Sequence, residues 1–170
     1  LLMIDKKLNS PPTSSLGRLF DAVSALIGIC GKNSYPAQAA IELEKAAGTS
    51  SEESYPFRLS REQKPYIIQL EVMFSRLIDD IKGEVCRELI ATKFHNTIIK
   101  AGVETALLIS QETGLKDVAI SGGVFQNKII CQGLIKQLKA RGLNPIYPRT
   151  IPVHDASIAL GQAVVANARN

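Results

Sequence analysis

Residues 121–127 read Ser-Gly-Gly-Val-Phe-Gln-Asn, the segment of this sequence with the most chemical content. The segment follows a short apolar run that predicts a buried strand, and it precedes a predicted helix. Ligands of open parallel sheets bind at the carboxyl ends of strands. Gly122 and Gly123 would let a ligand approach the backbone without a Cβ, and the helix N-terminus would offer free N–H groups to an anionic or polar ligand.

Asn127, the last residue of this segment, can both donate and accept hydrogen bonds, which suits a purine or a ribose. The segment is neither GxGxxG nor a phosphate-binding loop, because no Lys-Ser/Thr pair follows the glycines. Two interpretations remain open. The segment is either a nucleotide-binding turn or a tight strand-to-helix turn in which Asn127 is the N-cap.

Asp21 is the second candidate, because it lies on a small, polar stripe with Gly17 and Gly28 along a helix predicted over residues 16–27. A carboxylate flanked by glycines could accept both hydroxyls of a ribose. The alternative is an exposed carboxylate that pairs with Arg18 three residues earlier, and the residues alone favour this pairing.

Asp155 precedes the last predicted helix and allows two interpretations. Its carboxylate could bind a hard divalent cation, or it could be the helix N-cap, which propensity favours. His154 is adjacent, but neighbouring side chains rarely point at one metal. We therefore expect His154 to lie at the surface or to contact the metal ligands without binding the metal itself. His95 is a lone histidine within a long predicted helix and is expected to be a packing residue. Glu42 and Glu44 lie near the start of a short helix, where carboxylates interact favourably with the helix dipole.

The composition describes a globular chain of 170 residues with a net charge of +4, 45% hydrophobic and 21% charged residues. This length predicts one domain or two small lobes, and the mild charge predicts no nucleic-acid partner. The apolar runs are too short for a membrane span and no secretory signal is visible, so we expect a cytoplasmic protein without a membrane partner. The three cysteines are widely spaced and are expected to be reduced and mostly buried. The apolar start without an initiator Met suggests a piece of a longer polypeptide.

Hydrophobic periodicity predicts an α/β fold that is rich in helices. Residues 1–12 are expected to be a linker or tail, residues 13–114 helical, and residues 115–170 a βαβα segment with a small parallel βαβ unit. The predicted helices cover residues 16–27, 38–47, 70–81, 84–113, 127–140 and 155–168, and the predicted strands cover residues 55–59, 66–69, 118–120 and 144–147.

Five segments together resemble the C-terminal half of the Kae-like domain of the HypF carbamoyltransferase family of [NiFe]-hydrogenase maturation. They occur in family order, and the resemblance covers nearly all of the chain. The segments are residues 13–23 (TSSLGRLFDAV), 38–44 (QAAIELE), 94–97 (FHNT), 121–127 (SGGVFQN) and 157–163 (SIALGQA).

This resemblance implies the C-terminal lobe of an actin-like ATPase (ASKHA) domain over residues 13–170. It implies that Asp21 contacts a ribose, that Gly122 and Gly123 pack along a nucleotide, and that Asn127 contacts the nucleotide too. Glu42, in a matching segment, joins these cofactor-binding candidates.

The activity implied is that of an ATP-dependent carbamoyltransferase, which makes carbamoyl-adenylate and moves the carbamoyl group to the C-terminal Cys of its partner HypE. The cofactors are then ATP or carbamoyl-adenylate and a divalent metal. Asp155 would be one metal ligand, shared with an N-terminal lobe that this sequence lacks. The partners are that lobe, further modules of the same polypeptide, and HypE, and the isolated chain is expected to be inactive. The alternatives are a non-catalytic nucleotide-binding or interaction module, or a lobe of another Kae-like (threonyl)carbamoyl transferase.

Two segments depart from the family pattern, each by losing glycine. The family's Asn-Asp-Gly-Gly is replaced by residues 154–157, His-Asp-Ala-Ser, and its Tyr-Glu-Gly-Gln by residues 35–38, Tyr-Pro-Ala-Gln. The carboxylate of Asp155 is retained, but Ala37 and Ala156 add side chains where the family's backbone passes close to the ligand.

Overall fold

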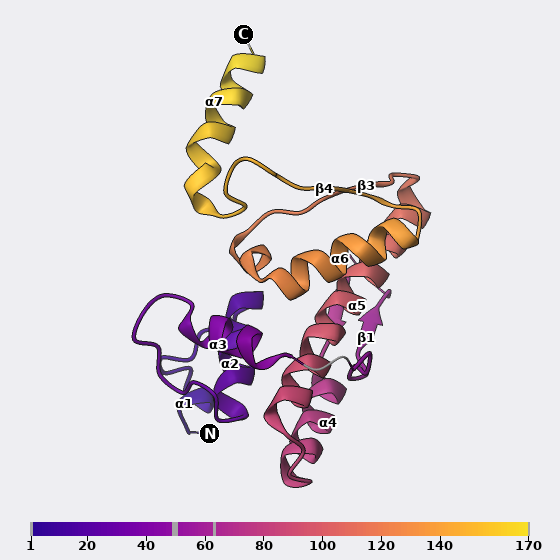
Figure 1. Ribbon diagram of the computed structural model, residues 1–170. Helices are drawn as coiled ribbons and strands as arrows, with labels where there is room; N and C mark the ends of the chain where they lie inside the picture. Colours follow the sequence, from indigo (N-terminus) through magenta and orange to yellow (C-terminus); the bar gives the residue numbers. More distant parts are fainter. Residues whose placement is uncertain (1, 49–50, 63, 170) are drawn as a thin grey trace.

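The computed structural model describes residues 2–48, 51–62 and 64–169 of the chain (Figure 1). Leu1 and Asn170, which belong to the predicted tail and the predicted lobe, lie outside the described residues. The helices are α1 (Leu2–Asp5), α2 (Leu16–Leu26), α3 (Gln38–Ala46), α4 (Glu71–Lys82), α5 (Arg87–Thr113), α6 (Lys128–Ala140) and α7 (Ile158–Ala168), with the 3₁₀ helices η1 (Gly123–Gln126) and η2 (Asp155–Ser157). The strands are β1 (Arg58–Ser60), β2 (Ile67–Gln69), β3 (Asp117–Ala119) and β4 (Asn144–Ile146).

The long helix α5 forms the centre of the fold, with α6 packed along one part of it and α3 against another (Figure 1). Glycines allow α5 and α6 to lie close together. A Cβ on Gly133 would lie 2.4 Å from Ile99 Cδ1, and one on Gly102 would lie 3.1 Å from Leu134 Cδ1. Gly102 therefore interrupts the predicted helix pattern for a packing reason and does not break the helix. The helix ends where Gly114 adopts the left-handed conformation, with φ of 74°.

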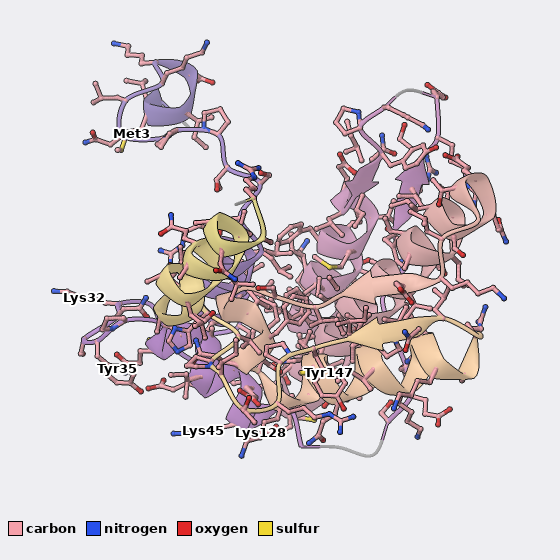
Figure 2. The ribbon with its side chains drawn as sticks, turned by 90° about the horizontal axis from the view of Figure 1, so that it is seen from above. Met3, Lys32, Tyr35, Lys45, Lys128 and Tyr147 are labelled. Carbon is pink, nitrogen blue, oxygen red and sulfur yellow. The ribbon has the colours of Figure 1, made fainter. Side chains whose placement is uncertain are left out.

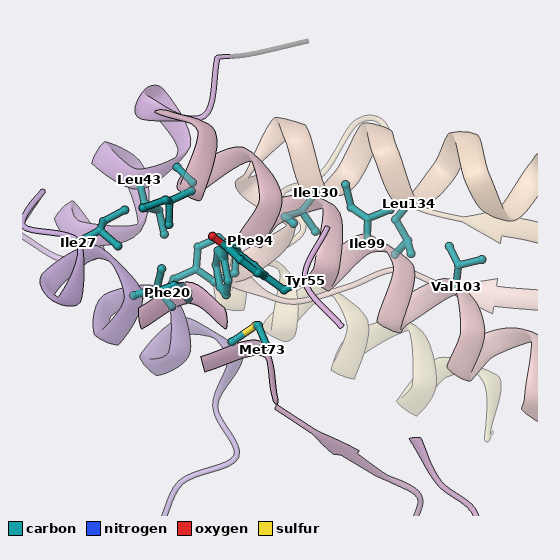
Figure 3. Packing of buried hydrophobic residues seen from close by; sticks show 14 of the residues in the cluster. Phe20, Ile27, Leu43, Tyr55, Met73, Phe94, Ile99, Val103, Ile130 and Leu134 are labelled. Carbon is teal, nitrogen blue, oxygen red and sulfur yellow. The ribbon is translucent and has the colours of Figure 1, made fainter. Parts of the chain in front are cut away.

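The hydrophobic core gathers residues from α2, α3, α4 and α6 around those of α5 (Figure 3). Phe20 of α2 packs edge to face on Phe94, with ring centroids 4.9 Å apart. Tyr55 extends from the loop before β1 into the same cluster and donates a hydrogen bond to Asp80 at 2.7 Å. The core thus holds α2, and with it any residue that α2 presents, in a fixed position relative to α5.

The predicted βαβ unit is confirmed, because β3 and β4 pair in parallel and α6 connects them. The register places Asp117 opposite Asn144 and Ala119 opposite Ile146. Ile120 and Ser121 connect β3 to Gly122 and Gly123, so the glycine-rich segment begins near the carboxyl end of a parallel strand, as expected. The other sheet is the antiparallel β1–β2 hairpin.

The structure differs from the predicted elements in three places. The strand predicted over residues 55–59 begins only at Arg58, because the Tyr55 backbone N–H donates to Thr97 Oγ1 at 2.8 Å and not to a neighbouring strand. The helix predicted over residues 84–113 begins at Arg87, because Glu84 has a positive φ of 56°. The exposed helix α1 lies within the predicted tail.

The cysteines are unpaired, as expected, but the prediction that they are mostly buried is wrong for one of them. Cys30 is buried and Cys131 is partly buried, whereas Cys86 is exposed just before α5. None of the helices in the described ranges is both long and apolar enough to cross a membrane.

Candidate functional site

A pocket of about 300 Å³ lies between α2, α3 and the segment that leads into α6. We call it the α2–α3–α6 pocket. It brings together segments that are more than 80 residues apart in the sequence, including part of the glycine-rich segment. Its lining consists of Gly17, Phe20, Ala37, Ala40, Ile41, Glu44, Gly123, Val124, Gln126 and Asn127.

The glycine-rich segment, residues 121–127, forms a turn that requires glycine at position 122. Gly122 has φ of 114° and ψ of 159°, a combination that L side chains rarely adopt. Its backbone N–H donates to the Val153 carbonyl at 2.7 Å, so the turn is fixed to the loop that carries Asp155. Gly123 has a different role: no atom lies closer than 4.0 Å to its ideal Cβ position, and it lines the pocket. A side chain there would fit the backbone but would occupy pocket space.

Asn127 is the N-cap of α6, which confirms the interpretation of the segment as a capped strand-to-helix turn. Its Oδ1 accepts a hydrogen bond from the Ile130 backbone N–H at 2.9 Å. Its Nδ2 lies 3.0 Å from His95 Nε2, and the side chain is buried. Asn127 also lines the pocket. The cap uses one Oδ1 lone pair and the histidine uses one amide hydrogen, so the side chain retains one donor and one acceptor.

His95 lies behind the pocket and is completely buried in the helix interface. Its Nδ1 is 2.7 Å from the Ala91 carbonyl oxygen, which can only accept, so Nδ1 carries the hydrogen. Burial lowers the pKa of His95, more than the Ala91 hydrogen bond raises it, and the neutral ring then offers Nε2 as an acceptor. The expected packing role is confirmed, because the ring lies edge-on to Phe20 with centroids 5.3 Å apart.

Glu44 is the acidic residue that reaches the pocket, whereas Glu42 of the same helix was the one predicted to bind the cofactor. Its Oε1 accepts a hydrogen bond from the Lys128 backbone N–H at 2.7 Å. Figure 2 labels Lys128 beside Lys45, at the edge where α3 meets the start of α6. The expected free N–H groups at this helix N-terminus are thus partly occupied by the protein itself: Glu44 takes one and Asn127 another. The remaining Glu44 acceptors suit hydroxyl groups better than they suit a phosphate.

Glu42, the carboxylate predicted to bind the cofactor, accepts a hydrogen bond from Gln38 Nε2 at 2.6 Å and does not line the pocket. The signal that separates it from Glu44 is helical phase. Two residues along a helix differ by about 200° in direction, so Glu42 and Glu44 point to different sides.

Asp21 pairs with Arg18 at 2.8 Å, which confirms the pairing that its residue type and spacing favoured. Asp21 lies one helical turn beyond Gly17. Gly17 is among the residues that line the pocket, and Asp21 is not. Gly28 lies at the opposite end of α2, where its carbonyl accepts a hydrogen bond from Arg87 at 3.0 Å. The predicted small, polar stripe therefore does not face one site.

Asp155 is exposed in the first position of η2, and the prediction that it is an N-cap is wrong. His154 is the cap: its Nδ1 accepts a hydrogen bond from the Ala156 backbone N–H at 3.3 Å. The described residues contain no group of three or more His, Cys, Asp and Glu side chains that could hold a metal ion. Asp155 alone does not fit a divalent cation, which normally takes several oxygen ligands.

Ala37 stands where the resembled family has glycine, and its backbone has the conformation that favours glycine. Its φ is 60° and ψ is 15°, in the left-handed region, at the N-cap position of α3. No side chain of its own caps the helix. Instead, Asn33 Oδ1 accepts a hydrogen bond from the Ala39 backbone N–H at 2.9 Å. Ala37 belongs to the pocket lining, so the loss of glycine affects both the backbone and a pocket residue.

A family model and several curated relatives match this chain. A family model described as carbamoyltransferase, Kae1-like domain, second subdomain, matches residues 1–162. Carbamoyltransferase HypF of Synechocystis is 36% identical over 90% of this chain, and a probable carbamoyltransferase HypF of Methanocaldococcus jannaschii is 33% identical over 98%. The chain spans only about a fifth of these relatives, 19% and 21% of their lengths.

A crystal structure of full-length HypF in a phosphate- and nucleotide-bound form superposes with a TM-score of 0.92 and 38% identity, covering 98% of this chain and 22% of that one. The fold is therefore that of a Kae1-like domain, with many helices and a small parallel sheet, as expected for a lobe of an actin-like ATPase.

Proposed function

The chain belongs to the HypF carbamoyltransferase family through its Kae1-like domain, and from this membership we propose that the α2–α3–α6 pocket binds the nucleoside end of an adenine nucleotide. The chain would form one wall of a nucleotide cleft in a longer enzyme. The observation that carries the proposal is the position of Gly123 and Asn127 in the lining of one pocket, at the carboxyl end of a parallel strand.

The chemistry of the lining supports a flat, largely neutral ligand. Small residues leave room between Phe20 and the turn, and among the described residues that line the pocket none is Lys or Arg. Glu44 provides carboxylate oxygens that can accept hydrogen bonds from ribose hydroxyls, and Asn127 keeps one donor and one acceptor. A base and a ribose match these groups, whereas phosphates would have to extend beyond them.

The reaction we propose for the whole enzyme is transfer of a carbamoyl group from carbamoyl-adenylate to the C-terminal Cys of HypE. The thiolate sulfur attacks the carbamoyl carbon, a C–S bond forms, and the bond from that carbon to the phosphate oxygen breaks, releasing AMP. In this step the described residues of this chain bind and orient the adenylate. We assign no step to a metal, because the described residues do not make a metal site.

The surface of α7 supports a role as part of a larger protein. The helix has no charged residue and no buried residue, and its exposed apolar side chains are Ile158, Leu160, Val164 and Val165. A helix that is apolar on all sides is normally buried. We infer that the additional polypeptide present in the longer relatives packs against α7, and that the assembled enzyme works in the cytoplasm with HypE as its acceptor.

The binding proposal can be tested with two matched glycine variants, Gly123→Val and Gly31→Val. Neither position has a positive φ or an atom closer than 4 Å to the ideal Cβ, but only Gly123 lines the pocket. Calorimetric titration with AMP should show binding on the order of millimolar, because only one wall of a cleft is present. Gly123→Val should abolish it and Gly31→Val should not. Equal binding by both variants would place the nucleotide elsewhere.

A further inference from the structure

We propose that His95 is a positioning residue of the α2–α3–α6 pocket: from behind the pocket it fixes the amide of Asn127 and the ring of Phe20, two groups that line it. This inference rests on the proposed nucleotide function. His95 itself is completely buried and does not line the pocket, so it acts only through these two neighbours.

The hydrogen-bond chain determines which way the Asn127 amide points. The Ala91 carbonyl fixes the Nδ1–H tautomer of His95, at 2.7 Å, and leaves Nε2 as an acceptor. Asn127 must then direct Nδ2 toward the ring, at 3.0 Å, and Oδ1 toward the Ile130 N–H, at 2.9 Å. A flipped amide would place Oδ1 against the Nε2 lone pair and Nδ2 against the Ile130 N–H, which would lose both hydrogen bonds.

Phe20 connects the same histidine to the other side of the pocket. Its ring lies edge-on to His95 at an interplanar angle of 83° and to Phe94 at 72°. Phe20 is 1% exposed, yet it contributes to the pocket lining from α2. One buried side chain of α5 therefore contacts pocket residues from α2 and from the start of α6, and sets the spacing between them.

A packing role alone would not require an imidazole. Leucine at position 95 would occupy a similar buried volume, but it would leave the Asn127 amide hydrogen without a partner in a buried place. Glutamine would keep an acceptor near the position of Nε2. The two variants therefore separate packing from positioning.

The test compares His95→Leu, His95→Gln and the unaltered chain by titration with AMP and by NMR of the Asn127 side-chain amide. We expect His95→Leu to weaken AMP binding about tenfold, in line with the loss of one buried hydrogen bond, and His95→Gln to stay within about threefold. Slow hydrogen exchange of the Asn127 amide should be retained in His95→Gln and lost in His95→Leu. In a double-mutant cycle, Asn127→Ala should weaken binding no further in the His95→Leu background.

Equal AMP affinities for the two His95 variants, or additive effects of the His95 and Asn127 substitutions, would overturn the positioning role. A different failure identifies the proposed function as the error. If the unaltered chain binds no AMP while its Asn127 amide is protected and His95→Leu removes that protection, the pocket does not hold a nucleotide, although His95 fixes Asn127 as inferred.

Discussion

Glu44 Oε1 accepts a hydrogen bond from the Lys128 backbone N–H at 2.7 Å, and this contact joins α3 to the first turn of α6 across the pocket. The two residues are 84 positions apart in the sequence. A carboxylate at a helix N-terminus satisfies an otherwise free N–H group and interacts favourably with the helix dipole. Glu44 therefore stabilises the pocket that it also lines.

Substitution of Glu44 should separate these two effects. We expect Glu44→Ala to lower the free energy of unfolding by about 1–2 kcal/mol, because the Lys128 N–H loses its partner, and Glu44→Gln to cost about half of that. Urea denaturation measures both. Glu42→Ala is the matched control two residues away, and it should have a smaller effect, because Glu42 only accepts from Gln38 within the same helix. A larger loss for Glu42→Ala would contradict the assignment.

Ala37→Gly should make the protein more stable. A non-glycine residue in the left-handed conformation costs roughly 1–2 kcal/mol, and glycine removes that cost while adding some entropy to the unfolded chain. We expect a net gain of about 0.5–1 kcal/mol in the free energy of unfolding, measured by urea denaturation. Ala40→Gly, inside α3, should instead lose about 1 kcal/mol. Destabilisation by both variants would show that position 37 is not strained.

Stability should depend on pH through His95. Burial lowers its pKa in the folded state, so the unfolded chain binds the proton more readily, and stability falls as pH decreases through the unfolded value near 6.5. Between about pH 7 and the lowered folded pKa, the unfolding free energy should decline by at most about 1.4 kcal/mol per pH unit. The comparison is with His95→Gln, which cannot titrate: the difference between the two stability curves should shrink toward acid pH. Parallel curves from about pH 8 to about pH 5 would contradict a buried neutral histidine.

Val164→Asp should test whether α7 is an interface. Val164 is 61% exposed, so the substitution should leave the melting temperature of this chain within about 2 °C. It should prevent association with the remainder of a HypF polypeptide supplied separately, measured by size-exclusion chromatography. Gln162→Asp, on the same helix, adds the same charge without removing an apolar side chain and is the matched control. Association that survives Val164→Asp would exclude this side of α7 from the contact.

The sequence predicted nearly every element within a few residues, because apolar spacing, glycines and prolines act locally. The 16–27 helix and the glycine-rich turn are examples: apolar spacing predicts the helix, and adjacent glycines predict the turn. For the start of β1 and for the acidic residue of the pocket, prediction failed because of contacts between distant segments. The choice of Glu44 over Glu42 depends on how α3 is rotated against α6.

The role of His95 depends on Asn127, 32 residues away, which no periodicity reveals. The cap of η2 shows a different limit. Propensity favoured Asp155, but the neighbouring His154 side chain accepts the Ala156 N–H, although histidine is not among the residue types that are preferred as N-caps. The residue types therefore predicted the position of the N-cap to within one residue. The local backbone conformation determines which of the two side chains accepts the hydrogen bond.

NMR titration of the ¹⁵N-labelled chain with AMP would show whether a nucleotide occupies the α2–α3–α6 pocket. We expect saturable shifts for the backbone amides of Gly17, Gly123 and Asn127, which line the pocket, and none for those of Gly31 and Gly142, which do not. Shifts confined to other residues, or no saturable shift at millimolar AMP, would mean that the pocket does not bind the nucleotide.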